Sequence, residues 1–199
     1  MTQPRYKADI AGGSLKIPES RIIAKLLLDG VHRDVWKHAI EIENVLRKRS
    51  PGTAKRQANL IRSRLAMMGP ELWELVHYGS VPVATHAVFA AAIKHSTLLG
   101  DFLDITVREA FRMFRPDLPR KLWIDFVEGC HNRDPFMPNW QESTINKLGD
   151  SVYRILQEVG YIGENPRYHL HPVRISAEVL AYLREHDEAH VLRCIQVSP

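Results

Sequence analysis

The stretch PVATHAVFAAAIKH, residues 82–95, decides the fold. It is rich in alanine and apolar on nearly all sides when it is drawn as a helix. A helix that is apolar all round must be buried among other elements. The stretch is also shorter than the roughly 20 residues that a membrane span needs. We therefore predict that it is the central helix of a helical bundle.

Helical patterns continue on both sides of this stretch, and residues 17–131 contain no β-pattern. Ser50-Pro51 is the clearest helix start, because a hydroxyl side chain at the N-cap is followed by proline at the first helical position. A second start is predicted at Asp34, with a buried stripe of Val35, Ala39, Ile42 and Leu46. The predicted helices are Pro18–Gly30, Asp34–Leu46, Pro51–Met68, Glu71–Tyr78, Pro82–His95, Leu98–Phe114, Pro119–His131, Ser143–Val159 and Ala177–His186.

The C-terminal third has a different pattern. Pro135 and Pro138 mark a boundary, and a helix then ends at Gly160-Tyr161-Ile162. Short extended pieces are expected at 161–163 and 168–170, around Asn165-Pro166, and at 173–175. This order resembles the last helix and wing of a winged helix-turn-helix, although a domain that serves packing alone has the same pattern. The predicted organisation is an arm (1–16), a helical bundle (17–132) and a winged-helix-like region with minor β-structure (133–199), in a mainly α fold.

Composition narrows the class of protein. The chain has 199 residues, 45% of them hydrophobic, which is enough for a core, and a formal net charge of +4. Its two cysteines, Cys130 and Cys194, form no CxxC pair, so we expect free thiols in a reducing compartment. The first ten residues are polar and resemble no signal peptide. These features predict a cytoplasmic protein without a membrane anchor.

Charge is segregated along the chain. Between Asn44 and Pro70 there is no Asp or Glu, but there are seven cations: Arg47, Lys48, Arg49, Lys55, Arg56, Arg62 and Arg64. On the predicted helix, Lys55, Arg56, Asn59 and Arg62 fall within roughly 120° of arc, opposite the apolar stripe. Ser50 and Thr53 lie at its positive end, where backbone N–H groups attract phosphate. A solvated basic face is the alternative interpretation.

A second group of candidate contacts lies in the tail. Lys147 and Arg154 would project from the helix over 143–159, and Arg167 and Arg174 from the predicted wing. Acidic side chains share the exposed face of that helix, so its charge is mixed.

No catalytic constellation is found in the sequence. Asp101 and Asp104 suit helix capping better than acid–base chemistry. His186 and His190 have a metal-like spacing but no accompanying glutamate motif. We therefore predict a protein that is not an enzyme, with no cofactor, no metal and no small-molecule substrate.

Two runs of sequence resemble a known family. Trp36, Asn44, RSPGTAKR (49–56) and Arg64-Leu65, and later GDFL (100–103), Trp140, Ser143-Thr144 and GYI (160–162), are similar to BrxA, the small accessory protein of bacteriophage-exclusion (BREX) defence systems. The resemblance covers roughly residues 5–185.

The resemblance implies a non-catalytic protein that binds double-stranded DNA and has a helical body similar to the antitermination factor NusB. Double-stranded DNA is the expected partner, held mainly through phosphates, and other BREX proteins are candidate partners. Two alternatives stay open. One is RNA binding in the manner of NusB, and the other is a protein-interaction scaffold within the defence complex.

Overall fold

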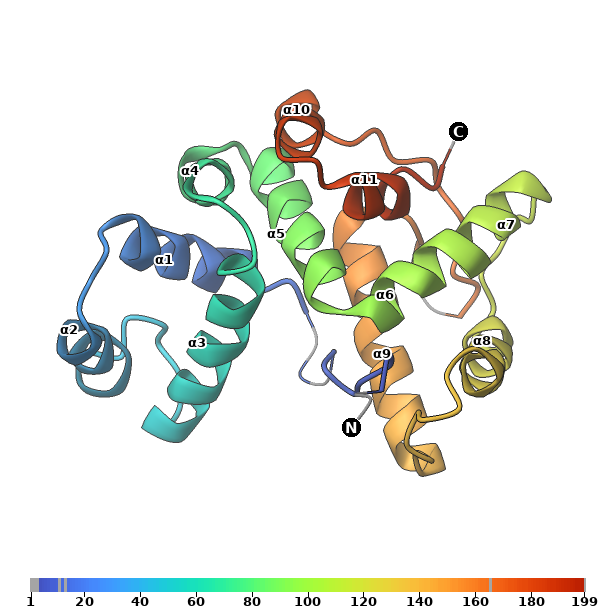
Figure 1. Cartoon of the computed structure of the whole chain (residues 1–199), viewed down its shortest axis with the longest axis horizontal. Helices are drawn as coiled ribbons and strands as arrows, with labels where there is room; N and C mark the ends of the chain where they lie inside the picture. The colour runs from blue at the N-terminus through green and yellow to red at the C-terminus, as the bar shows by residue number, and fades with distance from the viewer. Residues whose placement is uncertain (1–3, 11, 13, 165, 199) are drawn as a thin grey trace.

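The computed structural model describes residues 4–10, 12, 14–164 and 166–198, and within these the fold is mainly helical (Figure 1). The elements are α1 (Ile17–Leu28), α2 (Arg33–Lys37), the π-helical η1 (His38–Ile42), α3 (Pro51–Leu65), α4 (Pro70–Tyr78), α5 (Val81–His95), α6 (Thr97–Asp101), the π-helical η2 (Phe102–Val107), α7 (Arg108–Arg112), α8 (Lys121–Arg133), α9 (Glu142–Val159), α10 (Ala177–Glu185) and α11 (Ala189–Ile195). The predicted fold class is confirmed in its main part.

Helix α5 lies at the centre, as its apolar sequence predicts. Every side chain from Val83 to Ile93 is buried. The helix contacts α1, α3 and α4 on one side and α9, α10 and α11 on the other. Figure 1 shows α5 between these two groups of helices. Its buried polar groups have partners: the Thr85 hydroxyl donates to the carbonyl of Val81 at 2.8 Å, and His86 Nδ1 accepts from the Ser176 N–H at 3.1 Å.

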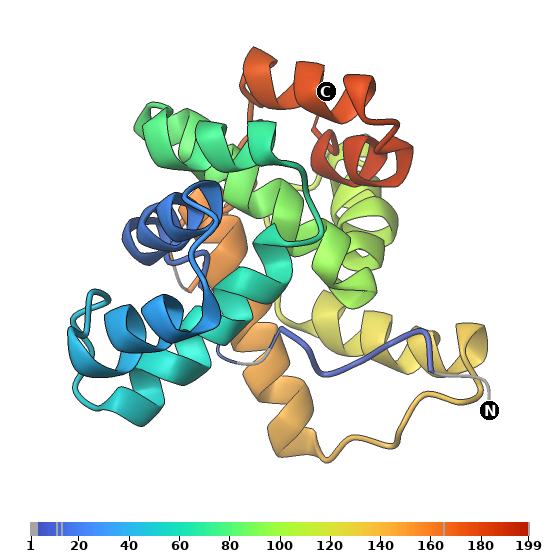
Figure 2. The same cartoon turned by 60° about the vertical axis from the view of Figure 1, so that its left-hand side comes forward.

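The N-terminal helices α1 to α4 form one side of the molecule (Figure 2). The stripe predicted from Asp34 onward is only partly right. Val35 and Ile42 are exposed, and Trp36 and Ile40 are buried in their place. The buried residues Trp36, Ala39 and Ile40 keep helical i, i+3, i+4 spacing, but the face is shifted by one residue from the predicted one, because the large Trp36 ring takes the core position instead of Val35. The predicted period is right there and the predicted phase is wrong.

The C-terminal side is built on α6, η2, α7, α8 and α9. Phe102 packs edge-on against Trp123 and Phe126, with ring centroids 5.2 Å apart in both pairs. Tyr153 of α9 lies 6.3 Å from Phe102. This aromatic cluster fastens α8 and α9 to η2, because edge-to-face rings stabilise one another beyond their buried area.

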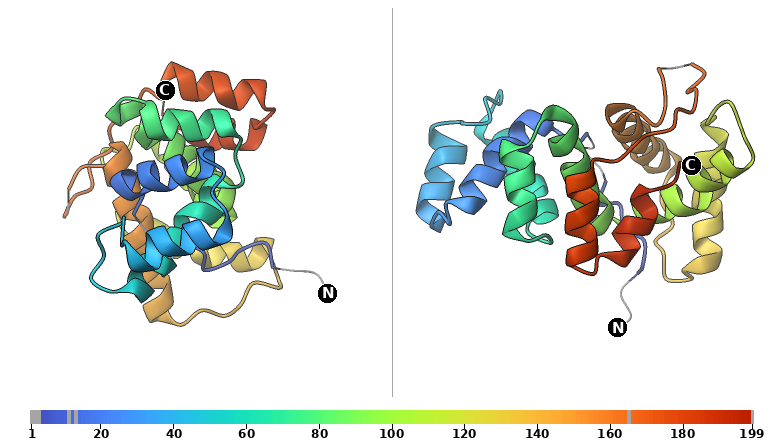
Figure 3. Two further views of the ribbon diagram at one scale, coloured as in Figure 1. Left: turned by 90° about the vertical axis from the view of Figure 1, so that its left-hand side faces the viewer. Right: turned by 90° about the horizontal axis from the view of Figure 1, so that it is seen from above.

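The N-terminal arm is irregular, as expected, but its apolar side chains are buried. Tyr6, Ile10 and Leu15 are buried. The Tyr6 hydroxyl donates to Asp101 at 2.7 Å, and Asp134 accepts from the Tyr6 N–H at 3.2 Å. The rotated views show the arm crossing between the N-terminal helices and α9 (Figures 2 and 3).

The predicted wing is not confirmed. Helix α9 ends at Gly160, whose φ of 96° suits glycine. The described residues contain two isolated β-bridges, Asp117 with His169 and Ile162 with Leu170, and no strand. One residue of the predicted turn, Asn165, lies outside the described residues. The two predicted pieces around Asn165 do pair with each other, since the Gly163 N–H donates to the His169 carbonyl at 2.8 Å and the His171 N–H to the Tyr161 carbonyl at 2.9 Å. The second piece also pairs with residues 116–118, since the Leu118 N–H donates to the Tyr168 carbonyl at 3.0 Å.

Two further expectations concern the chain as a whole. Buried side chains from both sides of residue 132 share one core. The division into 17–132 and 133–199 stays a prediction. The likeness to NusB also stays a prediction. Among the described residues, none of the helices has the length and apolar character needed to cross a membrane.

Candidate nucleic-acid interface

The loop before α3 carries two arginines and is closed by its own hydrogen bonds. Asn44 adopts a φ of 50°, a left-handed conformation that asparagine tolerates. Its side chain accepts from the Lys48 N–H at 2.8 Å and donates to the Lys48 carbonyl at 2.7 Å. Leu46 is buried beneath the loop. Arg47 and Arg49 are therefore exposed on a closed loop.

The start of α3 has the predicted cap. Ser50 Oγ accepts from the Thr53 N–H at 3.3 Å, and Pro51 occupies the first turn. The Ser50 hydroxyl also donates to Thr53 Oγ1 at 3.1 Å. The cap thus uses the Thr53 N–H, and among the described residues no acceptor pairs with the Gly52 N–H. Gly52 has open space around its Cα, so an anion can approach its N–H closely.

The faces of α3 are divided as the periodicity predicts. Ala54, Ala58 and Ile61 are buried. The polar residues on the opposite face are all exposed: Lys55, Arg56, Asn59 and Arg62.

Ion pairs reduce the free charge on this face. Lys48 Nζ bonds Glu19 Oε1, and Lys55 Nζ lies 3.2 Å from Glu41 Oε1. Both carboxylates come from segments before the acid-free run, so the sequence of the run itself does not indicate these ion pairs. Lys55 is exposed, whereas Lys48 is only partly exposed, and each shares its charge with an acid.

The remaining cations of the run differ in their surroundings. The Arg62 guanidinium lies 4.7 Å from the centroid of the Trp36 ring, an attractive cation–π contact that leaves its charge available. Arg47, Arg49 and Arg56 have no ionic partner among the described residues. These three are the cations most available to a polyanion.

Arg64 is not part of the exposed face, although it belongs to the acid-free run. It is 3% exposed, and its Nη1 donates to the Ser14 carbonyl at 3.1 Å. Its Nε has no partner among the described residues. Burial lowers the Arg64 pKa to about 10. Arg64 holds the arm against α3 and contributes no surface charge.

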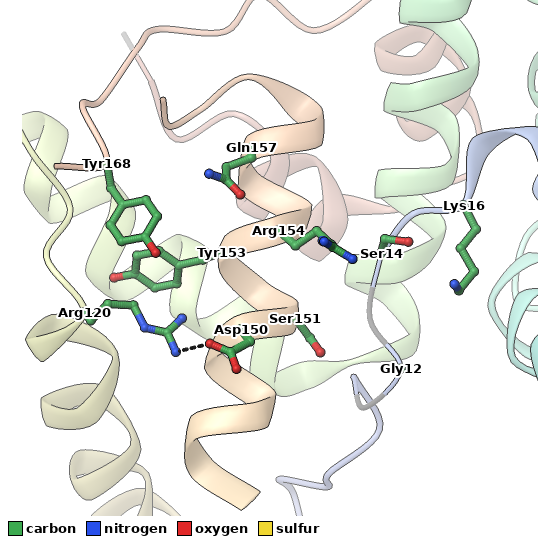
Figure 4. A pocket seen from close by; sticks show the side chains of 10 residues that line it. All are labelled: Gly12, Ser14, Lys16, Arg120, Asp150, Ser151, Tyr153, Arg154, Gln157 and Tyr168. Atoms are coloured by element: carbon green, nitrogen blue, oxygen red, sulfur yellow. Dashed lines mark hydrogen bonds and ion pairs between the residues drawn. The ribbon is translucent and has the colours of Figure 1, made fainter. Parts of the chain in front are cut away.

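A second basic site, absent from the sequence argument, lies between the arm and α9 (Figure 4). It is a hollow of about 540 Å³ whose lining includes Lys16, Arg120 and Arg154. Arg120 Nη2 bonds Asp150 Oδ1 at 2.6 Å, which neutralises the acid of the lining. Arg154 has no ionic partner among the described residues, and Figure 4 shows it directed toward the arm.

Lys16 connects this hollow with the loop before α3. Burial lowers the Lys16 pKa, and the charges of Lys48 and Arg64 lower it further, whereas Glu19 and Glu158 oppose the shift. Lys16 therefore lies within electrostatic range of the basic run and of α9. No local pattern pointed to Lys16 or Arg120, because the residues around them come from distant segments.

The other predicted contacts are exposed but lie apart from α3. Lys147 is on the first half of α9. Arg167 lies in the loop that pairs with residues 116–118, and Arg174 in the extended segment before α10. The structure does not bring these three residues together with the α3 face.

The candidate metal ligands do not converge. His186 Nε2 lies 3.6 Å from Glu71, and His190 Nε2 lies 3.7 Å from Cys194 Sγ. Over the residues that the structure describes, there is no group of three or more His, Cys, Asp or Glu side chains able to hold a metal ion. Both cysteines are buried free thiols.

Fold and site together define a mainly helical protein with an exposed basic face on its N-terminal side. A sequence profile of the BrxA family matches residues 4–187. The chain therefore belongs to the BrxA family.

Relatives of known name support this assignment. The chain is 69% identical to a "BREX protein BrxA" of Paramagnetospirillum magneticum over the full length of both, and 35% identical to one of Escherichia coli O9:H4 over 88% of this chain and 83% of the relative. A solved structure, a crystal structure of an uncharacterized protein from Magnetospirillum magneticum, is 67% identical and superposes with a TM-score of 0.92. The match covers 98% of this chain and all of that one.

Proposed function

We propose that this BREX protein is a non-catalytic component that binds double-stranded DNA mainly through its phosphates. The observation that carries the proposal is the set of exposed cations between residues 47 and 62, of which Arg47, Arg49 and Arg56 lack ionic partners within the described chain. Cations matched to a phosphate backbone give affinity that does not depend on base sequence.

The start of α3 supports the same function. The Gly52 N–H lies at the positive end of a 15-residue helix, where a phosphate is favoured by the helix dipole and by a free donor. Arginine forks on both sides, from Arg49 and Arg56, suit neighbouring phosphates.

The hollow beside α9 extends the proposed path of the duplex. Lys16 and Arg154 would contact phosphates beyond those reached from α3, and Lys147, Arg167 and Arg174 remain candidates for more distant contacts. Other BREX proteins are proposed partners, because the relatives in the family carry that name.

The test is a fluorescence-anisotropy titration on a random duplex, repeated at about 50 and 200 mM salt. Phosphate-driven binding should weaken by orders of magnitude over this range. An unlabelled duplex should displace the probe, and a single-stranded RNA of equal length should compete much less well. Preferential displacement by RNA would favour the RNA-binding alternative. Absence of binding at 50 mM salt would refute the proposal and leave the scaffold.

A further inference from the structure

A partly apolar hollow lies between α4 and α10, on a different surface from the basic face. Its volume is about 470 Å³, and Leu75, Ala181 and Tyr182 supply apolar lining. Tyr182 is nearly buried beneath the hollow, where its hydroxyl accepts from the Gly69 N–H at 2.7 Å and its ring stacks on His186, so it forms the floor. Figure 1 shows α4 and α10 beside each other, and the two helices are in contact.

Four glutamates surround this hollow. Glu71 and Glu74 come from α4, and Glu178 and Glu185 from α10. Glu71 lies 3.6 Å from His186, whereas the other three have no ionic partner among the described residues. No Lys or Arg belongs to the described lining. Like charges at close range repel one another, so a cationic ligand would relieve this repulsion.

An exposed aromatic side chain lies at the same place. Tyr78 is 72% exposed at the end of α4. Arg21 fixes the backbone around it by donating to the carbonyls of His77 and Gly79, at 2.7 Å each. Lys25 of α1, a cation within electrostatic range of this end of α4, is itself paired with Asp29 at 2.5 Å. The backbone that carries Tyr78 is therefore fixed, and its ring, which lies edge-on to His77 with the centroids 4.4 Å apart, is open to a partner.

We propose that this acidic groove, lined by α4 and α10, binds an amphipathic helix of a partner protein that carries leucine-like side chains on one face and Lys or Arg beside them. Charge complementarity argues for this occupant, because the groove has four acids and no lining cation. Both helices have nine residues, so the groove is about 13 Å long and suits about two and a half turns of helix. This surface does not depend on the DNA-binding proposal.

The experiment uses the full chain and a fluorescein-labelled 14-residue peptide with leucines at i, i+4 and i+7 and lysines on the flanks. A scrambled peptide of the same composition is the control. The designed peptide should bind the wild-type protein at least about 10-fold more tightly than the scrambled one, because only it presents a continuous apolar face. Tyr78→Ala should weaken its binding by about 5-fold or more, since exposed aromatics anchor interfaces.

Charge reversal tests the acidic part of the groove. The double variant Glu74→Lys/Glu178→Lys should weaken peptide binding at least about 10-fold, as reversed rim charges repel a cationic helix. Asp125→Lys/Glu128→Lys on α8 makes the same change in net charge at exposed positions outside the groove and should leave peptide binding at the wild-type level. Both double variants should bind the duplex equally well, which keeps this test separate from the DNA-binding proposal.

Three results would overturn the proposal. Equal binding of the designed and scrambled peptides would show attraction by charge alone. Unchanged binding in Glu74→Lys/Glu178→Lys would place the peptide elsewhere. Self-association measured by light scattering and abolished in that variant alone would make a second copy of this chain the occupant, through a head-to-tail contact.

Discussion

Helices α3 and α9 each bury one face and expose the other, but their charges are compensated in opposite ways. The exposed face of α3 carries cations, and its stretch of sequence contains no acid. The tertiary structure then brings Glu41 from an earlier segment to within 3.2 Å of Lys55. The exposed face of α9 mixes both signs, and the structure pairs Asp150 with Arg120 at 2.6 Å.

The difference shows that a helix face cannot be assigned a charge from its own residues. On α3 the fold reduces the free positive charge, whereas on α9 it neutralises an acid and leaves Arg154 available. Glu158 of α9 is also engaged, since it accepts from the Leu15 N–H at 2.6 Å. Two surfaces that differ in sequence thus become more alike in the folded protein.

The largest expected effect comes from the α3 region. Replacing Arg47, Arg49 and Arg56 together with Ala should reduce duplex affinity about 100-fold at 0.1 M salt and lower the salt slope by about 2.7, since each lost phosphate contact removes about 0.9. The matched control is Arg112→Ala/Lys121→Ala/Arg184→Ala, which removes three exposed cations elsewhere. Equal losses in both variants would show that net charge alone governs binding.

A smaller effect is expected at the hollow beside α9. Arg154→Ala should weaken duplex binding about 10-fold and reduce the salt slope by about 0.9, because one contact is lost. The same titration with Lys147→Ala compares two cations of one helix. A loss confined to Lys147→Ala would move the contact from the hollow to the first half of α9.

Removing an acid beside α3 should have the opposite sign. Glu41→Gln frees Lys55 and should tighten duplex binding about 2-fold to 3-fold, in line with the small energy of an exposed ion pair. Glu43→Gln removes the same charge beside His38 instead, where the ring lies 3.3 Å away, and should have less effect. Identical gains would mean that the pairing of Lys55 does not matter.

The smallest effect on binding is expected from Arg64. Burial lowers its pKa to about 10, so its charge costs stability at every pH below about 10, and the cost eases only as the pH rises beyond that value. Arg64→Met should leave duplex affinity unchanged and change the melting temperature at pH 7 only little, because the relief of the desolvation cost is offset by loss of the bond to the Ser14 carbonyl. Arg64→Lys, which retains the charge, should not gain stability. A clear loss of affinity in Arg64→Met would return this residue to the interface.

Sequence patterns predicted most of the helices, with errors at identifiable places. The apolar stretch at 82–95 indicated α5, and Ser50-Pro51 indicated the start of α3. The helix α11 was missed because His186 to His190 showed no clear start signal. The extended pieces expected after Gly160 do pair with each other, but only through isolated bridges, and one of them also pairs with residues 116–118, so the winged-helix interpretation stays a prediction.

The sequence by itself determined the mainly helical fold and the buried and exposed faces of α3, because helical periodicity and capping act over only a few neighbouring residues. It also determined the membership in the BrxA family, which rests on similarity of sequence alone. Tertiary structure alone decided which cations are free. Lys55 meets Glu41, Arg64 is buried against Ser14, and Arg120 neutralises Asp150. Such contacts join residues separated by 14 to 50 positions, and no local pattern encodes them.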